Sequence, residues 1–364
     1  MRKNTVDRIR DSLAAVWTIT AKDIVDALRN KLVISLIIMG SIMLLLPKLL
    51  PYIFEEPAPI LPVYATGESQ LLTRLQEDPA LSVLRVRSEE EYRLALCSSL
   101  YPLIGLRIPP KFDQALAANG PVEFQGDVCW SRRFQVTGLK EKLETLLSQS
   151  LGRPVTFQLD RNIVYSPSQG IFLLSMAAVN MVVVILMIGT VLVPNLFFEE
   201  KQTRTLQALL VSPATISQVV TGKVFAGLFY ILVTAAVMFA ISWMDVIHWG
   251  LVVVFVVAGG IFSVALGLVL GSFYEKPQDT AGLMTLLSVV LIGAVLVKMI
   301  GMKLPPLLEA ILPWVPSVAL AELCRSVFIE SVPLTLIASN VGIILIVSLA
   351  LYALVVWKIR RSDR

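Results

Sequence analysis

Residues 197–223 hold the side chains best suited to chemistry in this sequence, and that chemistry is the docking of a partner protein. Three leucines of this polar island recur at helical spacing and share one face: Leu206, Leu209 and Leu210. Its charged side chains lie elsewhere on the same helix: Glu200, Lys201 and Arg204. Ser212-Pro213 starts a second helix, because serine caps a helix start and proline fits the first helical position. An elbow of this kind between two apolar runs predicts a cytosolic partner that pushes on it.

The usual catalytic and metal-binding patterns are missing from the sequence. The single histidine, His248, cannot build a zinc site of the usual kind, and no cysteine cluster compensates for it. No Gly-x-Ser-x-Gly nucleophile motif occurs. Gly222-Lys223 is followed by Val224 and lacks the upstream glycine of a phosphate-binding loop. We therefore expect no enzyme activity, cofactor or metal in this chain, and any ATP that drives it must be bound by another chain.

The composition is that of a membrane protein. Of 364 residues, 56% are hydrophobic and 16% are charged, whereas soluble domains hold about 25% charged residues. A membrane core of about 30 Å requires about 20 apolar residues in a helix. Six runs are long enough: residues 32–54, 170–198, 224–244, 250–273, 281–300 and 335–357. The sequence predicts an α-helical polytopic protein with six transmembrane helices.

Lys and Arg in the short loops predict the orientation, since cytoplasmic loops carry an excess of both. With the N-terminus inside, cytosolic segments hold most of them, and the short outer loops hold only Lys298, Lys303 and Arg325. We expect the protein to lie in the inner membrane of the cell, with both termini in the cytosol. The net charge of +4 reflects this topology, so nucleic acid is not an expected partner.

Residues 1–31 are predicted to form an amphipathic helix at the membrane interface. Apolar side chains recur near helical spacing: Val6, Ile9, Leu13, Val16, Trp17, Ile24 and Leu28. Charged side chains take the other side: Arg8, Arg10, Asp11, Lys22, Asp23 and Arg29. The alternative is a basic cytosolic tail.

Residues 55–165 are predicted to form the one soluble domain, outside the cytoplasm. Strand-like stretches cover residues 61–65, 81–87, 101–108, 122–125 and 155–159, and helix-like stretches cover 69–77, 89–98, 111–118 and 138–149. This alternation favours a small α/β domain. Cys97 and Cys129 both fall in it, where a disulfide is permitted, but their spacing alone does not show that they pair.

Residues 166–364 are predicted to contain the remaining five spans. Between the last two, residues 301–334 are rich in proline and also apolar, which predicts half-helices that dip back into the outer leaflet. The spans contain almost no charged residues. A carrier driven by protons or sodium is expected to bury carboxylates, so an apolar pathway for an amphipathic substrate is favoured.

Residues 199–213, followed by Gly222-Lys223, resemble the signature of ABC-2 type exporter permeases. That signature runs roughly Glu-(Arg/Lys)-x-x-Gly-Thr-Leu-Glu-x-Leu-Leu-x-(Ser/Thr)-Pro, with a Gly-Lys further on. The Thr-Leu, Leu-Leu, Ser-Pro and Gly-Lys positions match, whereas Arg204 stands where glycine is usual and Gln207 where glutamate is usual. Supporting similarity lies in residues 21–31, which resemble the family's elbow helix, and in residues 321–325 before the last span. The domain at 55–165 resembles the large extracytoplasmic insert of one subfamily.

The resemblance implies two permeases, identical or paralogous, with two separate ATPase subunits that bind ATP and magnesium. The island would contain the coupling helix that seats in a groove on the ATPase. The residues implied in this coupling are Glu199, Glu200, Arg204, Leu206, Leu209, Leu210, Ser212, Pro213, Gly222 and Lys223. The expected function is export of a lipid-like, drug-like or other amphipathic molecule, with membrane lipid and an extracytoplasmic protein as further expected partners. The competing hypothesis is a non-transporting sensor or assembly module whose outer domain binds a partner.

Overall fold

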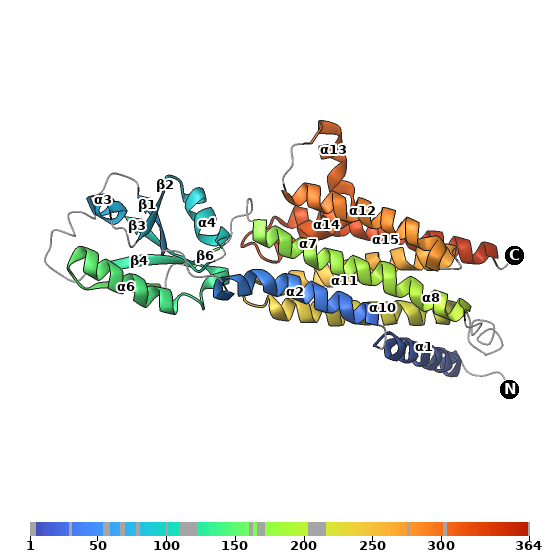
Figure 1. The fold of residues 1–364 in the computed structure, drawn as a ribbon. Coiled ribbons are helices and arrows are strands. Elements are labelled where there is room, and N and C mark those ends of the chain that lie inside the picture. Colours follow the sequence, from blue (N-terminus) through green and yellow to red (C-terminus); the bar gives the residue numbers. More distant parts are fainter. Residues whose placement is uncertain are drawn as a thin grey trace.

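The computed structural model describes residues 5–28, 31–53, 59–65, 70–77, 81–99, 101–108, 122–159, 163–165, 172–202, 216–274, 277–300 and 304–362. Long helices form a bundle, and a mixed β-sheet with its own helices lies at one end of that bundle (Figure 1). We call the described part of residues 59–165 the sheet unit, and the adjacent end of the bundle its sheet end. The first and last helices, α1 and α15, both reach the far end (Figure 1).

Among the described residues, six helices are long and apolar enough to cross a membrane, so the predicted polytopic helical fold is confirmed. They are α2 (Lys31–Ile53), the span built from α7 (Phe172–Met187), η2 (Ile188–Leu192) and α8 (Val193–Gln202), then α10 (Ile216–Ile241), α11 (Trp249–Phe273), α12 (Pro277–Ile300) and α15 (Leu334–Ser362). The bounds agree with the six apolar runs to within a few residues, except that α10 begins earlier. Its first turns carry the Gly222-Lys223 pair of the island.

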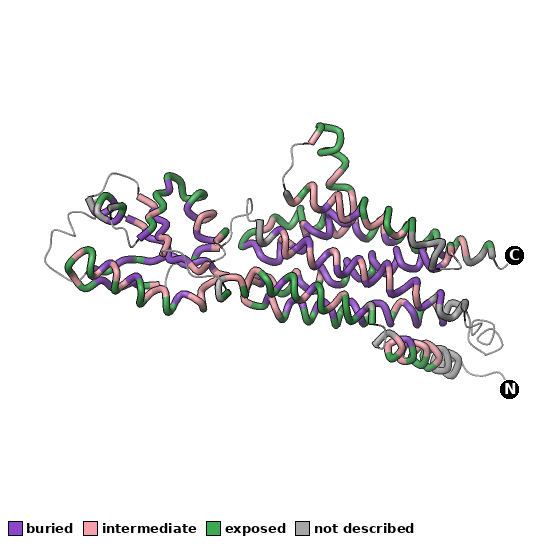
Figure 2. Tube along the Cα trace, in the orientation of Figure 1, coloured by how far each residue is buried: buried purple, intermediate pink, exposed green. Residues whose placement is uncertain are grey.

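The second and fourth spans form the centre of the bundle. Their apolar windows are 67% and 72% buried, compared with 17% or less for α2, α12 and α15 (Figure 2). Small residues bring these two spans together, since an added Cβ on Gly267 would lie 2.1 Å from the carbonyl oxygen of Gly189. The π-helical segment η2 lies just before Pro194, whose missing N–H interrupts the regular helix pattern.

The helix α1 (Thr5–Leu28) lies beside α10 at the far end of the bundle (Figure 1). Leu13 and Trp17 on this helix are 65% and 71% exposed, whereas Thr20 and Asp23 are buried. The predicted helix over residues 1–31 therefore exists over residues 5–28, and its apolar side chains around Trp17 point away from the bundle.

The sheet unit contains six strands in the order β2-β1-β3-β4-β5, with β6 also paired to β4. They are β1 (Ile60–Ala65), β2 (Ser82–Val86), β3 (Ile104–Ile108), β4 (Val122–Cys129), β5 (Val155–Gln158) and β6 (Ile163–Val164). Its helices are α3 (Gln70–Glu77), α4 (Glu89–Ser98), η1 (Trp130–Arg132) and α6 (Thr137–Leu151). Only the β3–β4 pairing is antiparallel, and β1–β2, β1–β3, β4–β5 and β4–β6 are parallel.

The sheet unit has its own apolar core, separate from that of the bundle. Leucines of α3 and α6, among them Leu75 and Leu143, pack with side chains from five of the strands. The strand side chains include Ile104, Phe124 and Phe157. The helix α4 packs through Tyr92, whose ring covers Gly105 of β3 so closely that an added Cβ would lie 2.2 Å from the tyrosine oxygen. The helix expected at 111–118 lies outside the described residues.

The proline-rich segment contains α13 (Pro306–Ile311), η3 (Leu312–Trp314) and α14 (Pro316–Ser326), and its two halves are bent by 73°. The helix α14 is buried in the bundle. The helix α13 projects from the bundle (Figure 1), and Leu307 of α13 is 72% exposed and Trp314 of η3 70% exposed. A pair of helices bent in this way occurs in a broken span as well as in a re-entrant segment, so the re-entrant segment at residues 301–334 stays a prediction.

Candidate functional site

The structure describes the helices on both sides of the predicted docking segment. Glu199 and Glu200 lie on α8, of which the structure describes the backbone at these two positions. Six of the predicted residues lie outside the described residues: Arg204, Leu206, Leu209, Leu210, Ser212 and Pro213. Gly222 and Lys223 lie near the start of α10 and are described in full. The candidate site is therefore built from the residues that hold α8 and α10 together.

Lys223 is fully buried, and its ammonium group joins three helices. Its Nζ donates a hydrogen bond of 2.8 Å to the backbone oxygen of Leu196 on α8. It also lies 3.4 Å from Oδ2 of Asp23 on α1, a carboxylate whose side chain is 4% exposed. We call Lys223, Asp23 and the Leu196 carbonyl the Lys223 node. A buried charge is costly unless it is paired and hydrogen-bonded, and here both requirements are met at the base of the island.

Gly222 allows α1 to approach α10 closely enough for this pairing. A Cβ added to Gly222 would lie 2.7 Å from Cγ2 of Ile19, so the Ile19 side chain or α1 itself would have to shift to admit it. The backbone oxygen of Gly222 also accepts a hydrogen bond of 3.2 Å from Oγ1 of Thr20. Two turns further along α10, the hydroxyl of Tyr230 donates to the backbone oxygen of Ile24. The Gly-Lys pair thus provides both the space and the charge that fasten α1.

Asp23 is the residue of this site that sequence reasoning missed. The sequence places it among the charged side chains opposite the apolar face of α1 and gives no sign of its burial, whereas in the structure Asp23 is 3% exposed. Its neighbours on the same helix, Lys22 and Asp26, are not buried. The residue types alone do not indicate that Asp23 is buried while Lys22 and Asp26 are not. Only the three-residue spacing from Thr20, which also faces α10, places Asp23 on the packed side.

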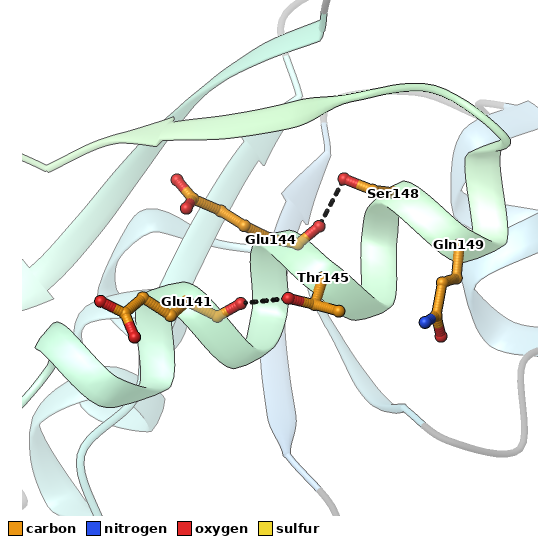
Figure 3. Close-up of a pocket in the computed structure, with 5 residues that line it drawn as sticks. All are labelled: Glu141, Glu144, Thr145, Ser148 and Gln149. Atoms are coloured by element: carbon orange, nitrogen blue, oxygen red, sulfur yellow. Dashed lines mark hydrogen bonds between the residues drawn. The ribbon is translucent and has the colours of Figure 1, made fainter.

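A shallow, open depression on α6 is lined by Glu141, Glu144, Thr145, Ser148 and Gln149 (Figure 3). Its polar groups already serve the fold. Oε1 of Glu144 accepts a hydrogen bond of 2.7 Å from the backbone N–H of Phe157, and Oγ of Ser148 accepts one of 2.9 Å from that of Val155. These contacts hold α6 against the edge strand β5, which is a structural role.

Cys97 and Cys129 are joined by a disulfide that ties α4 to the end of β4, with their Cα atoms 5.3 Å apart. Within the described residues, no group of three His, Cys, Asp or Glu side chains gathers as a metal site. Nε2 of His248 lies 3.0 Å from the backbone oxygen of Glu330, so the one histidine fastens a loop.

Comparison with known families identifies the chain. Curated protein sequences give no match to it. The model of the family described as ABC-2 family transporter protein matches residues 32–357, which include nearly all of the six spans and the whole sheet unit. This match covers most of the chain, and a transporter family agrees with the six apolar helices of the bundle. The protein therefore belongs to the ABC-2 transporter family, as a multi-pass permease of the kind that works with an ABC ATPase subunit.

Proposed function

We propose that this protein is the permease subunit of an ATP-driven exporter whose ATPase docks on the island, residues 197–223. The observation that carries the proposal is the Lys223 node. The helix that enters the island, α8, and the helix that leaves it, α10, are joined by one buried ammonium group. The same group fastens α1. A push on the island therefore reaches three helices together instead of being lost in a flexible linker.

The proposed coupling is mechanical. ATP and magnesium bind to the partner ATPase, whose movement displaces the docked leucine face of the island: Leu206, Leu209 and Leu210. The π-helical segment η2 and Pro194, at the start of α8, form an irregular stretch in the second span. The span can bend at this stretch when the island moves the other end of α8. The fourth span packs tightly against this stretch through Gly267, so both central spans respond.

The remaining parts of the proposal follow from surface and charge. The protein lies in the inner membrane with both termini and the island in the cytosol and the sheet unit outside, as its Lys and Arg distribution favours. The transported molecule is lipid-like or otherwise amphipathic, because the buried core of the bundle is apolar with few charges. The lightly buried spans α2, α12 and α15 leave apolar surface for membrane lipid and for a second permease subunit.

The test is co-purification of the tagged full chain from its native membrane. We expect an ABC ATPase subunit to co-purify with the wild-type chain and to be lost from Leu209→Glu and Leu210→Glu variants. Gln207→Glu is the matched control, because it adds the same charge to the same segment off the leucine face, at a position where the family usually has glutamate. If ATPase association and transport survive both leucine substitutions, the coupling assignment is wrong, and the sensor or assembly module becomes the better hypothesis.

A further inference from the structure

The loop that joins α10 to α11, residues 242–248, lies at the sheet end of the bundle and is fastened to the segment that follows α14. The backbone N–H groups of Ile247 and His248 both donate to the backbone oxygen of Val327, at 3.0 and 3.1 Å. The contact of the His248 ring with Glu330 adds to this attachment. We call residues 242–248 the α10–α11 loop.

The helix α2 holds the start of the same loop. Nζ of Lys48 donates a hydrogen bond of 2.9 Å to the backbone oxygen of Ile241, the last residue of α10. It also forms an ion pair of 2.8 Å with Asp245 of the loop. Carbonyl oxygens at a helix C-terminus lack partners within the helix and carry partial negative charge, so a lysine placed here fixes the end of α10.

Arg133 brings the sheet unit to this loop. One of its terminal nitrogens donates a hydrogen bond of 2.9 Å to the backbone oxygen of Met244. Its guanidinium carbon lies 3.6 Å from the ring centre of Trp130 and 4.4 Å from that of Phe134, so the planar group is held between aromatic rings of its own turn. The ring of Phe134 stacks in turn on Trp243 of the loop, with centroids 6.0 Å apart.

The turn that carries Arg133 is itself firmly attached to the sheet unit. Trp130 follows directly on Cys129, whose disulfide with Cys97 anchors the end of β4 to α4. The indole ring of Trp130 stacks on Tyr165, with ring centroids 5.4 Å apart. Burial lowers the pKa of Arg133, and the Asp245 charge opposes this shift, so the guanidinium keeps the charge that an arginine carries in proteins.

We propose that Arg133 is a positioning residue that locks the sheet unit to the α10–α11 loop, so that the sheet unit moves with α10 as one body. Then α10 is fastened at both ends: by the Lys223 node at the far end, and by Lys48 and Arg133 at the sheet end. The attachment is independent of the proposed exporter function. The transmission of ATPase movement to the sheet unit rests on that function.

Electron spin resonance distance measurements test the attachment on the full chain in lipid nanodiscs, without any ATPase. Spin labels are placed at the exposed positions Gln149 on α6 and Leu349 on α15. We expect a single narrow distance in the otherwise wild-type chain and its loss, as a broad distribution, in the Arg133→Ala variant. Arg133→Lys keeps the charge and loses the planar stacking, so its distribution should be intermediate.

Arg85→Ala is the matched control, because this arginine lies exposed on β2 of the same sheet and should leave the distance narrow. Should Arg133→Ala fail to fold, Trp243→Ala tests the same contact from the loop side and should also broaden the distance. A distribution as narrow as wild type in Arg133→Ala, or in Trp243→Ala where that variant must serve, overturns the proposal.

A second label pair, at Gln149 and at Val237 on α10, tests the common movement in the complex with its ATPase. Adding a non-hydrolysable ATP analogue should leave this distance unchanged while distances within the bundle change. A changed distance between Gln149 and Val237 refutes movement as one body, even if the attachment survives the first test. Failure to isolate an ATPase complex at all would count against the proposed function and leave the first test standing.

Discussion

Breaking the Lys223 node should destabilise the protein far more than removing both of its charges. In Lys223→Met, the Asp23 carboxylate stays buried at 4% exposure with its cation removed, and the Leu196 oxygen loses a donor. Removing one partner of a buried ion pair costs about 3–5 kcal/mol. Asp23→Asn should be destabilising in the same direction, because the buried Lys223 ammonium then loses the Asp23 anion.

The double variant Asp23→Asn/Lys223→Met leaves neither charge buried. Replacing a buried pair by uncharged groups of similar volume is often close to neutral, so we expect it within about 1–2 kcal/mol of wild type. The two single effects should therefore not add, and the double variant should lose less stability than either single variant. The free energy of unfolding is measured by titrating the purified protein with SDS in mixed micelles. Lys22→Met, which removes a neighbouring exposed lysine of α1, should change it by no more than about 0.5 kcal/mol.

The reasoning fails if Lys223→Met costs less than about 1 kcal/mol, or if the double variant loses the sum of the two single losses. Either result would mean that Lys223 is not held by Asp23 at the base of the island.

Further predictions concern the close approach of α1, the buried tyrosine and the orientation. Gly222→Val should separate α1 from α10, because its Cβ would meet Ile19 at 2.7 Å, and proteolysis of α1 in membranes should speed up relative to Gly250→Val, where the added Cβ meets nothing. Burial, and then the Asp127 carboxylate, raise the pKa of Tyr92 above its ordinary value of 10.0. The stability that the protonated Tyr92 hydroxyl contributes is complete below about pH 10 and is lost above it, by up to about 1.4 kcal/mol per pH unit. Thermal unfolding should therefore show a smaller loss of stability at alkaline pH in Tyr92→Phe than in wild type. The cysteine of a Gln149→Cys variant should react with an impermeant maleimide on intact cells. Labelling only after lysis would show that the predicted orientation is wrong.

The spans and their order could be predicted because a membrane core imposes length and hydropathy on each segment directly. The strand-like stretch at residues 122–125 is shorter than β4, which continues to Cys129 through Gly126 and Asp127, two residue types that are common in turns. In the structure a Cβ added to Gly126 would lie 2.6 Å from Cδ2 of Leu159, and Asp127 is buried as the acceptor for Tyr92. Both residues continue the strand for reasons that depend on tertiary contacts.

The candidate site was predictable in part. The Gly222-Lys223 pair could be found from its place after the island, but its burial could not, because it depends on a helix that lies 200 residues earlier in the chain. Arg133 had no signal at all, since it sits in an irregular turn and its partner Met244 contributes only a backbone oxygen. The docking leucines were identified from periodicity, and they remain a prediction because residues 203–215 lie outside the described residues.

The central claim is that an ATPase seats on the island, and photo-crosslinking in the native membrane tests it most directly. A photoreactive amino acid replaces Leu209 in the full chain, and the control chain carries it at Leu349 on α15. We predict an adduct with a nucleotide-binding ABC ATPase subunit from position 209 and none with that protein from position 349. An adduct from position 209 only with lipid, or only with proteins that bind no nucleotide, would contradict the claim.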